Sequence, residues 1–236
     1  QKTAYEIPKR DWSSDVCSSD LGPAVLAVQL AWCEDWKWAS DEVPELDWTP
    51  HRAVNGPNEV MVVPSGPADA FETCTLMYMH LIGAAKRRLW IASPYFVPDE
   101  GIIAALQLAA KRGVDVRLML PGRSDNLLVW LSGFSFYPDI IPAGVKVYRY
   151  GPGFMHHKVL LCDATVAVGT ANFDNRSFRI NFEVTLLAEG SIDEAVVAMM
   201  QRDFERCRGA SLHDFERRPS WFRAAARTAR LLSPVQ

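Results

Sequence analysis

The 236-residue sequence predicts an α/β layered domain in which a mixed, mostly parallel sheet is flanked by helices. From residue 59 onward, short β-rich runs alternate with stretches of helical periodicity of roughly 10 to 17 residues, the pattern of strands joined by crossover helices. The last strands of the pattern are short and close together in sequence. Part of the sheet is therefore expected to be antiparallel.

The clearest single element is a helix over residues 99–112, where the apolar residues share one face and Gly113 provides a stop. The other expected helices comprise residues 24–38, 69 or 70–86, a segment from about 125, and 192–208. The expected strands comprise residues 60–63, 89–92, 114–120, 145–150, 156–162, 166–170 and 181–187.

The composition is that of an ordinary globular protein, with 49% hydrophobic residues, 22% charged residues and a formal net charge of -3. This charge argues neither for nor against nucleic acid. No apolar run reaches the roughly 18 residues of a membrane span, and no secretory signal is recognised at the start. The cysteines show no close pair and no metal-ligand spacing, which indicates reduced thiols in a cytosolic setting. They are Cys17, Cys33, Cys74, Cys162 and Cys207.

The chemistry of the chain is indicated by a His-x-Lys motif, His156 and Lys158, in an expected strand. Side chains alternate along a strand, so these two should point the same way and His157 the other way. An imidazole can attack phosphorus or move a proton, and an ammonium can hold phosphoryl oxygens. The pair therefore suits a phosphodiester substrate.

The residues that follow extend the motif: Asp163 after four intervening residues, then the runs 169–172 (GTAN) and 181–183 (NFE). The whole segment 155–187, MHHKVLLCDATVAVGTANFDNRSFRINFEVTLL, resembles the second HKD motif of bacterial cardiolipin synthases in the phospholipase D superfamily. Segments 93–100 (SPYFVPDE) and 113–122 (GVDVRLMLPG) carry the resemblance independently. It covers roughly residues 22–234 and implies the phospholipase D-like fold, built of two similar halves that share one site.

One departure from the family concerns the turn between two motif strands. Relatives commonly have six residues between the motif Asp and the Gly, whereas here five residues, 164–168, separate Asp163 from Gly169. We interpret this as a shorter turn that leaves the site intact. A slipped strand register would instead turn Thr170 and Asn172 away from the site.

The resemblance also implies roles for the site residues. One motif histidine attacks phosphorus and the other moves the proton, and His156 is expected to be the general acid/base. Lys158 should bind the non-bridging oxygens, helped by the amide of Asn172 and the hydroxyl of Thr170. No metal and no cofactor is expected, because the histidines and the lysine supply both nucleophile and charge.

Glu183 is expected to accept a hydrogen bond from a catalytic histidine, which the resemblance allows to come from the other half. Asp163 lies five residues after Lys158, so it should face away from the site and anchor backbone or a turn. His157 is expected to be a neighbour, not a catalyst. Arg176 and Arg179 could meet lipid phosphates or belong to a solvated loop.

The implied domain organisation has four parts. Residues 11–21 (DWSSDVCSSDL) look like a translated sequencing adapter, so residues 1–21 are expected to be unrelated to the fold. Residues 22–58 should be the end of a first phospholipase D-like half and a linker, residues 59–209 the second HKD domain, and residues 210–236 an amphipathic tail. The first half, with the other HKD motif, is therefore expected to be a partner that this sequence does not contain.

The tail itself allows two interpretations. On a helix, Phe222, Ala225, Ala229 and Leu232 form an apolar stripe beside a row of arginines. Such a helix could lie on an anionic membrane surface or dock on the domain with its arginines solvated. The resemblance to enzymes with lipid substrates favours the membrane.

The implied function is transfer of a phosphatidyl group between two phosphatidylglycerol molecules through a phosphohistidine, giving cardiolipin and glycerol. The expected partners are an anionic phospholipid substrate and the membrane surface, and no nucleic acid is expected. The expected location is the cytosolic side of the bacterial inner membrane, where the protein would bind peripherally or be anchored through the missing N-terminal region. Two alternatives remain open. One is a phosphodiester hydrolase or a homodimeric single-HKD nuclease, for which the net charge and scattered arginines show no basic groove. The other is an inactive lipid-binding fragment.

Overall fold

A computed structural model describes residues 22–50, 58–123 and 125–236. The chain divides into two compact units, Gln1–Pro57 and Asn58–Gln236, which are described separately. The adapter-like segment and residues 51–57 of the expected linker lie outside the described residues. In the first unit, helix α2 (Ala24–Ser40) ends at Asp41, whose backbone is left-handed with φ of 61°. The Gln29 amide then binds the Asp47 carbonyl oxygen at 2.8 Å, which ties the following segment back to the helix.

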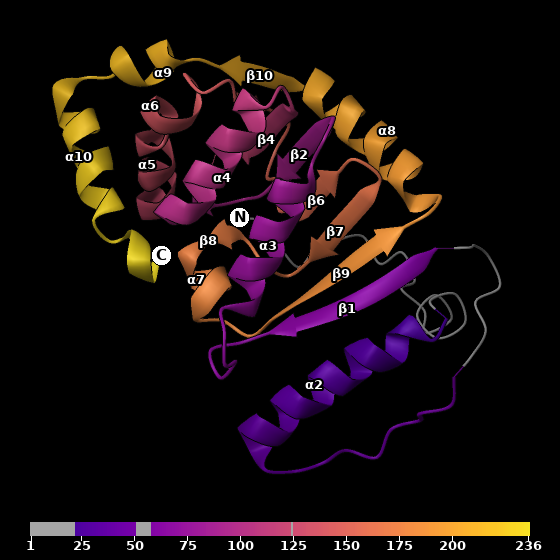
Figure 1. Cartoon of the computed structure of the whole chain (residues 1–236). Helices are drawn as coiled ribbons and strands as arrows, with labels where there is room; N and C mark the ends of the chain where they lie inside the picture. The colour runs from indigo at the N-terminus through magenta and orange to yellow at the C-terminus, as the bar shows by residue number, and fades with distance from the viewer. Residues whose placement is uncertain (1–21, 51–57, 124) are drawn as a thin grey trace. The chain divides into compact units, whose positions relative to one another are not determined.

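The second unit is built on an eight-stranded sheet with the order β1-β9-β7-β6-β2-β4-β5-β10 (Figure 1). The strands are β1 (Glu59–Ser65), β2 (Arg88–Ala92), β4 (Asp115–Pro121), β5 (Lys146–Tyr150), β6 (Val159–Cys162), β7 (Thr165–Gly169), β9 (Glu183–Glu189) and β10 (Cys207–Ala210). Two further strands, β3 (Phe96–Val97) and β8 (Phe173–Asp174), pair with each other in parallel.

Nine helical segments of this unit surround the sheet or cap its ends. They are α3 (Thr73–Ala84), α4 (Glu100–Lys111), α5 (Leu127–Ser135), α6 (Tyr137–Ile140), α7 (Asn175–Arg179), α8 (Ile192–Glu205), α9 (Leu212–Glu216), α10 (Ser220–Arg230) and the 3₁₀ turn η1 (Ser233–Val235), counted over the described residues.

The mixed α/β sheet predicted from the sequence is confirmed, but its parallel part is smaller than expected. Only β2 with β4 and β4 with β5 pair in parallel within the described sheet. The other neighbouring strands pair antiparallel. The reason lies in the connections: the link between β6 and β7 is only residues 163–164, and a parallel crossover needs a dozen residues or more.

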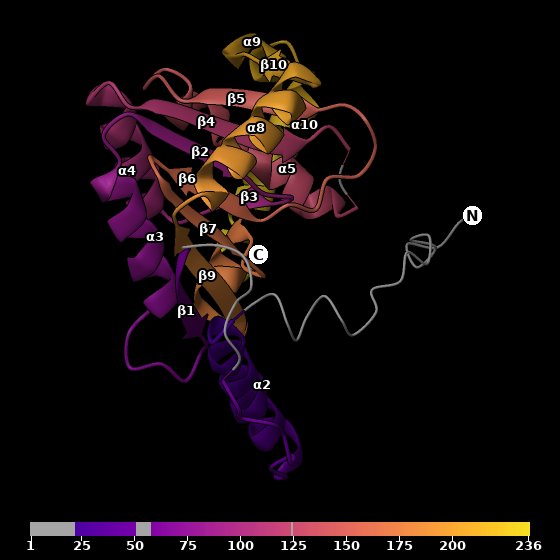
Figure 2. The ribbon, with the colours of Figure 1, turned by 90° about the vertical axis from the view of Figure 1, so that its right-hand side faces the viewer.

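Strand β2 shows how the sheet divides the core into two layers. Leu89 and Ile91 lie in the larger cluster, with α3, α4 and α5. Trp90 and Ala92 lie in the smaller cluster, with α8. Figure 2 shows α3 and α4 on one side of the strands and α8 on the other. Successive side chains of β2 point to opposite faces of the sheet and are apolar on both, as expected for a strand that is covered on both sides.

Several element boundaries differ from the sequence predictions. The helix expected from residue 69 or 70 begins at Thr73, and the strand expected from residue 156 begins at Val159. The helix expected over 192–208 ends at Glu205, because the next residues form β10 and pair with β5. That pairing is non-local, so helical periodicity gives no sign of it. The predicted helix at 99–112 is present as α4, with Asp99 accepting a hydrogen bond from the amide of Ile102 at 2.8 Å.

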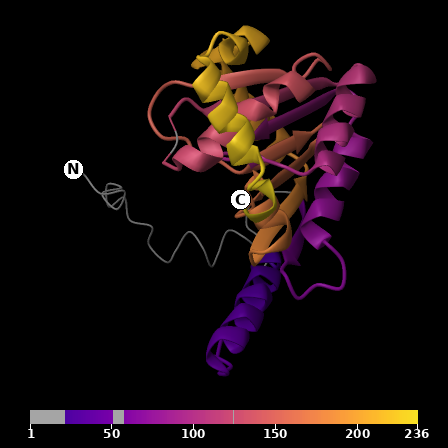
Figure 3. The ribbon, with the colours of Figure 1, turned by 90° about the vertical axis from the view of Figure 1, so that its left-hand side faces the viewer.

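The C-terminal tail docks on the domain. Phe222, Ala226 and Ala229 of α10 are buried, and the Phe222 ring packs edge-on against Trp130 and Phe134 of α5. Figure 3 shows α10 lying across the outside of the helical layer. The expectation that the stripe containing Phe222 and Ala229 faces a membrane is therefore wrong, because these side chains complete the protein core.

This docking predicts unequal effects for two adjacent aromatic residues. Phe222→Ala should lower the free energy of unfolding by about 3 kcal/mol, since it removes a buried ring and leaves a cavity. Trp221→Ala should change it by less than about 1 kcal/mol, since Trp221 is 69% exposed. Urea unfolding followed by circular dichroism measures both. Equal effects would contradict docking through the Phe222 face.

Candidate active site

His156 and Lys158 lie together immediately before β6. The Lys158 Nζ atom is 3.1 Å from His156 Nε2 and 3.3 Å from His156 Nδ1. His157 points elsewhere, with its Nδ1 atom 3.9 Å from the Asp203 carboxylate on α8. The extended chain thus separates the two histidines as the alternation predicts, although the residues precede the strand instead of belonging to it.

Asp163 anchors the other end of β6. Its backbone is left-handed, with φ of 52°, and its carboxylate accepts hydrogen bonds from the amides of Lys86, Arg87 and Arg88 at 2.9, 2.9 and 3.0 Å. Burial opposes its charge, but these backbone bonds hold the pKa of Asp163 below its ordinary value. The contacts agree with the predicted structural role for this residue.

Glu183 is buried and hydrogen-bonded within the motif. Its carboxylate accepts from the Asn181 amide at 3.0 Å and from the Thr170 hydroxyl. The Thr170 oxygen in turn accepts from the amide of Val184 at 3.0 Å. Among the described residues, no histidine donates to Glu183. The hydrogen bond from His156 is therefore absent, and a partner histidine from another half remains a prediction.

Thr170 and Asn172 are placed by the β6–β7 hairpin, which pairs Val159 with Val168. Because Thr170 reaches Glu183, the five-residue spacing has not turned it away from the motif. Its hydroxyl proton is directed to Glu183 in this structure, and the expected contact with substrate oxygens stays a prediction. Asn172 carries a buried side-chain oxygen that has no hydrogen-bond partner in the described part of the chain.

The sequence interpretation missed Phe154 and Asp125, which act on His156, and Tyr95, which bonds to Asp125. The Tyr95 hydroxyl donates to the Asp125 carboxylate at 2.9 Å, and the Phe154 ring stacks on His156 with centroids 5.6 Å apart. The negative charge of Asp125 acts to raise the pKa of both His156 and Lys158. A signal for Asp125 was available: it follows β4, which is parallel to β2, so its loop leaves the same edge of the sheet as the Tyr95 loop.

The loop after β2 is joined to the motif by hydrogen bonds. The Ser93 hydroxyl accepts from the amide of Phe173 at 2.9 Å and donates to the carbonyl oxygen of Tyr95 at 2.7 Å. Asp174 follows and caps α7 by accepting from the amide of Ser177 at 2.8 Å. Burial raises the pKa of Asp174. These bonds fix the Tyr95 loop against the segment that carries Asn172.

The electrostatics of the pair favour a neutral His156. Burial and then the adjacent Lys158 charge lower the pKa of His156. Burial also lowers the pKa of Lys158, although the charges of Glu183, Asp174 and Asp125 oppose this. An anion that binds Lys158 would offset the repulsion and make protonation of His156 easier.

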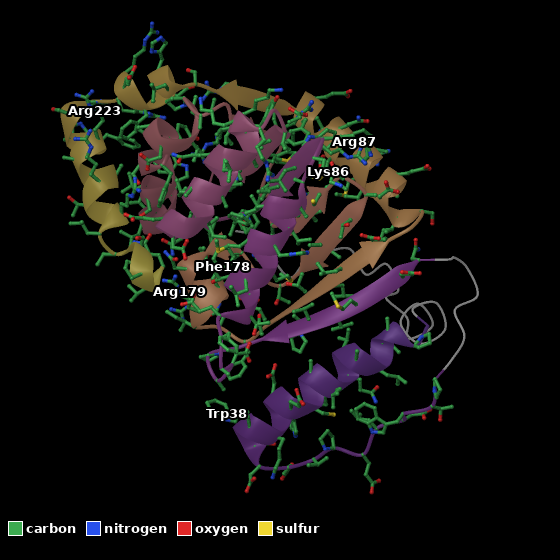
Figure 4. All side chains as sticks on the ribbon, viewed as in Figure 1. Trp38, Lys86, Arg87, Phe178, Arg179 and Arg223 are labelled. Atoms are coloured by element: carbon green, nitrogen blue, oxygen red, sulfur yellow. The ribbon has the colours of Figure 1, made fainter. Side chains whose placement is uncertain are left out.

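The two arginines expected near the site are engaged differently. Arg179, labelled on α7 in Figure 4, forms ion pairs with Glu72 at 2.9 Å and with Asp99 at 2.6 Å. These pairs tie α7 to the starts of α3 and α4. This use favours a structural role for Arg179 over a contact with lipid phosphate. The Arg176 side chain is exposed, and its backbone amide donates to the carbonyl of Gln236 at 2.7 Å.

No group of three or more His, Cys, Asp or Glu side chains among the described residues is arranged to hold a metal ion, and no helix of that part is long and apolar enough to cross a membrane. A hollow of about 590 Å³ lies between α5, α6, α7 and α10, and neither His156 nor Lys158 lines it.

The chain belongs to the phospholipase D-like family: residues 78–208 match the family model "Cardiolipin synthase, PLD-like domain". Cardiolipin synthase A of Pseudomonas aeruginosa (strain LESB58) is 48% identical over 217 residues, covering 91% of this chain and 44% of the relative. Cardiolipin synthase A of Pseudomonas syringae pv. syringae is 44% identical over 91% of this chain and 45% of the relative. The chain thus spans less than half the length of these relatives.

Solved structures show the same fold. Nuc, a phospholipase D family member from Salmonella typhimurium, superimposes with a TM-score of 0.56 at 22% identity, covering 65% of this chain and 99% of Nuc. Phosphatidylserine synthase from Haemophilus influenzae superimposes with a TM-score of 0.60 at 14% identity, covering 80% of this chain and 51% of that chain.

The Asp163 contacts predict a pH-dependent contribution to stability. Because the folded state lowers the pKa of Asp163, its contribution is full above the ordinary value of 3.8 and is lost as pH falls through the folded pKa. Asp163→Asn should lower the free energy of unfolding at pH 7 by about 2 kcal/mol. The difference from the parent should shrink on acidification. Chemical unfolding between pH 7 and 3 measures it, with the exposed Glu205→Gln as control. A difference in unfolding free energy that stays constant with pH would contradict stabilisation by the charged Asp163 carboxylate and its three backbone hydrogen bonds.

The pair at the site predicts a change in a histidine titration. Lys158→Met should raise the pKa of His156, because it removes a positive charge 3.1 Å from the imidazole. NMR of the imidazole protons through a pH titration measures this. Lys86→Met should leave the His156 titration unchanged. An unchanged or lowered pKa in the Lys158 variant would show that the two side chains do not interact in solution.

Proposed function

We propose that this chain is the second half of a phosphatidyl transferase of the cardiolipin synthase type. The observation that carries the proposal is the His156–Lys158 pair, with an imidazole nitrogen 3.1 Å from an ammonium at an exposed edge of the domain. The similarity to proteins named cardiolipin synthase A supports the choice of lipid substrates.

In the proposed reaction, a histidine of the other half attacks the phosphorus of one phosphatidylglycerol. A P–N bond forms and the P–O bond to glycerol breaks, while His156 gives its proton to the departing oxygen. The headgroup hydroxyl of a second phosphatidylglycerol then loses its proton to His156 and attacks phosphorus, which breaks the P–N bond. The products are cardiolipin and glycerol, and both histidines return to their starting protonation states.

Lys158 is the group proposed to hold the phosphoryl oxygens. Its ammonium offers three donors, one of which is directed toward His156 in the free site. Charge grows on the non-bridging oxygens in the transition state, so a fixed ammonium stabilises it more than the ground state. The same contact would reduce the repulsion that lowers the pKa of His156, so substrate binding itself favours the protonated acid.

Glu183 is proposed to support the histidine of the other half. It is buried beside the motif, and its negative charge acts on Lys158, yet no histidine of the described chain donates to it. A carboxylate in this position could orient an incoming imidazole and stabilise its charged form. The missing N-terminal HKD half is therefore one proposed partner. Anionic lipid is the other, and the proposed location is the inner face of the cytoplasmic membrane.

The proposal is tested by joining residues 22–236 to the N-terminal half of the Pseudomonas aeruginosa relative and supplying phosphatidylglycerol vesicles. We expect cardiolipin and glycerol in equal amounts. His156→Ala should slow transfer by about 10²–10⁴-fold, because positioned acid/base catalysis is lost. His157→Ala is the matched control and should have a mild effect. The isolated chain should show at most slow residual turnover.

Other products would identify the alternatives. Phosphatidic acid in place of cardiolipin would mean that water is the acceptor and that the protein is a hydrolase. Transfer by the His156→Ala variant within tenfold of the parent would sink the proposed role of this residue. A folded joined protein that binds lipid without any turnover would favour a non-catalytic lipid-binding function.

A further inference from the structure

Helix α10 has a second, outward-facing stripe of apolar and small residues. Trp221, Ala224, Thr228 and Leu231 follow one another at spacings of three and four residues, so they share one side of the helix. Trp221 is 69% exposed and Leu231 is 78% exposed. The opposite side of α10 packs on α5. Trp221 and Leu231 are therefore exposed although the helix is docked on the domain. We call these four residues the outer stripe.

The outer stripe lies within a strongly basic segment. Residues 217–232 contain five arginines and no carboxylate, in a chain whose formal net charge is -3. Arg230 is paired with Asp139 at 2.5 Å, and Arg218 lies over the Phe222 ring at 5.0 Å. The guanidinium groups of Arg217 and Arg227 are exposed and form no ion pair within the part of the chain that the structure describes. Arg227 also lines the rim of the hollow of about 590 Å³ that contains Asp139, so its exposed guanidinium lies near a carboxylate without forming an ion pair with it.

The position of α10 connects this surface to the catalytic edge. Phe222, adjacent to Trp221, contacts Trp130 near the start of α5. Helix α5 begins at Leu127, two residues after Asp125, whose charge acts on His156. Helix α10 is thus joined through α5 to the segment that carries Asp125. Figure 4 shows Arg223 on the outer side of the same helix.

We propose that the outer stripe, with Arg217 and Arg227, is a contact surface for an anionic lipid bilayer. Trp221 and Leu231 would enter the interfacial layer and the arginines would meet headgroup phosphates. An aromatic ring with one polar end is suited to that layer. The proposal deepens the lipid transferase function and rests on it for the choice of ligand.

Charge complementarity selects the bilayer over a second copy of the chain. A two-fold contact through this face would place the same patch on both sides of the interface. Both sides would then carry the arginines of residues 217–232 and none of their charge would meet a carboxylate of that segment, and like charges across an interface cost free energy. An anionic bilayer offers the opposite charge over the whole stripe.

The test measures binding of the 236-residue chain to sedimented vesicles, without any turnover. The probe is vesicles of phosphatidylglycerol and phosphatidylcholine, compared with phosphatidylcholine alone. Arg217→Gln with Arg227→Gln should weaken binding by about fivefold for each arginine, and only on the anionic vesicles. Trp221→Ser with Leu231→Ser should weaken binding by at least about tenfold.

A matched control uses the same types of change elsewhere. Leu108→Ser on α4 (59% exposed) and Arg202→Gln on α8 should leave binding unchanged. Equal binding by the outer-stripe variants and the parent, with all proteins folded by circular dichroism, would overturn the proposal. A dimeric parent and a monomeric Trp221→Ser with Leu231→Ser variant would also overturn it, because the face would then be a contact between two copies of the chain. Because the assay does not measure turnover, loss of transferase activity alone would count against the proposed function and not against this surface.

Discussion

The site depends on the carboxylate of Asp163 and its three backbone hydrogen bonds. These bonds hold the turn after β6 against residues 86–88, where β2 begins. Strands β2 and β6 run antiparallel, with Leu89 opposite Cys162, so fixing this end fixes the register of the whole pair. The other end of β6 then delivers Lys158 to the edge where the loop after β2 leaves the sheet. The clamp and the catalytic pair are thus opposite ends of one short strand.

This arrangement gives a physical reason for the motif spacing. Four strand residues separate Lys158 from Asp163, and at about 3.3 Å per residue the two lie roughly 16 Å apart. Val159 to Cys162 are apolar because they pass between the two layers of the core. An insertion in this stretch would turn Lys158 to the opposite face or move it beyond the edge. The aspartate is therefore tied to the motif through the backbone amides that bond to its carboxylate.

The features that were predicted correctly from the sequence are those set by contacts between residues close together in the chain. The alternation around His156 and Lys158, the helix near residues 99–112 and the backbone anchoring by Asp163 follow from spacing along one element, and the observed contacts agree with each. Contacts between distant segments were missed: the β10 strand, the Tyr95–Asp125 bond and the docking of Phe222 on α5. Periodicity shows that the tail has an apolar side, but not whether protein or lipid covers it. The domain boundaries and the catalytic roles remain predictions.

The same geometry supports the proposal that a second half completes the site. In the described chain His156 is exposed at a sheet edge, and its pKa is lowered by burial of part of the ring and by Lys158. Glu183, by contrast, is buried and bonded to Thr170 and Asn181, with no imidazole to orient. In the proposed mechanism, the described half thus presents an acid/base without a nucleophile and a carboxylate without its histidine. A second half that brings an imidazole to Glu183 would also exclude water from His156, and in that drier setting the Lys158 charge would act more strongly on a bound phosphoryl group.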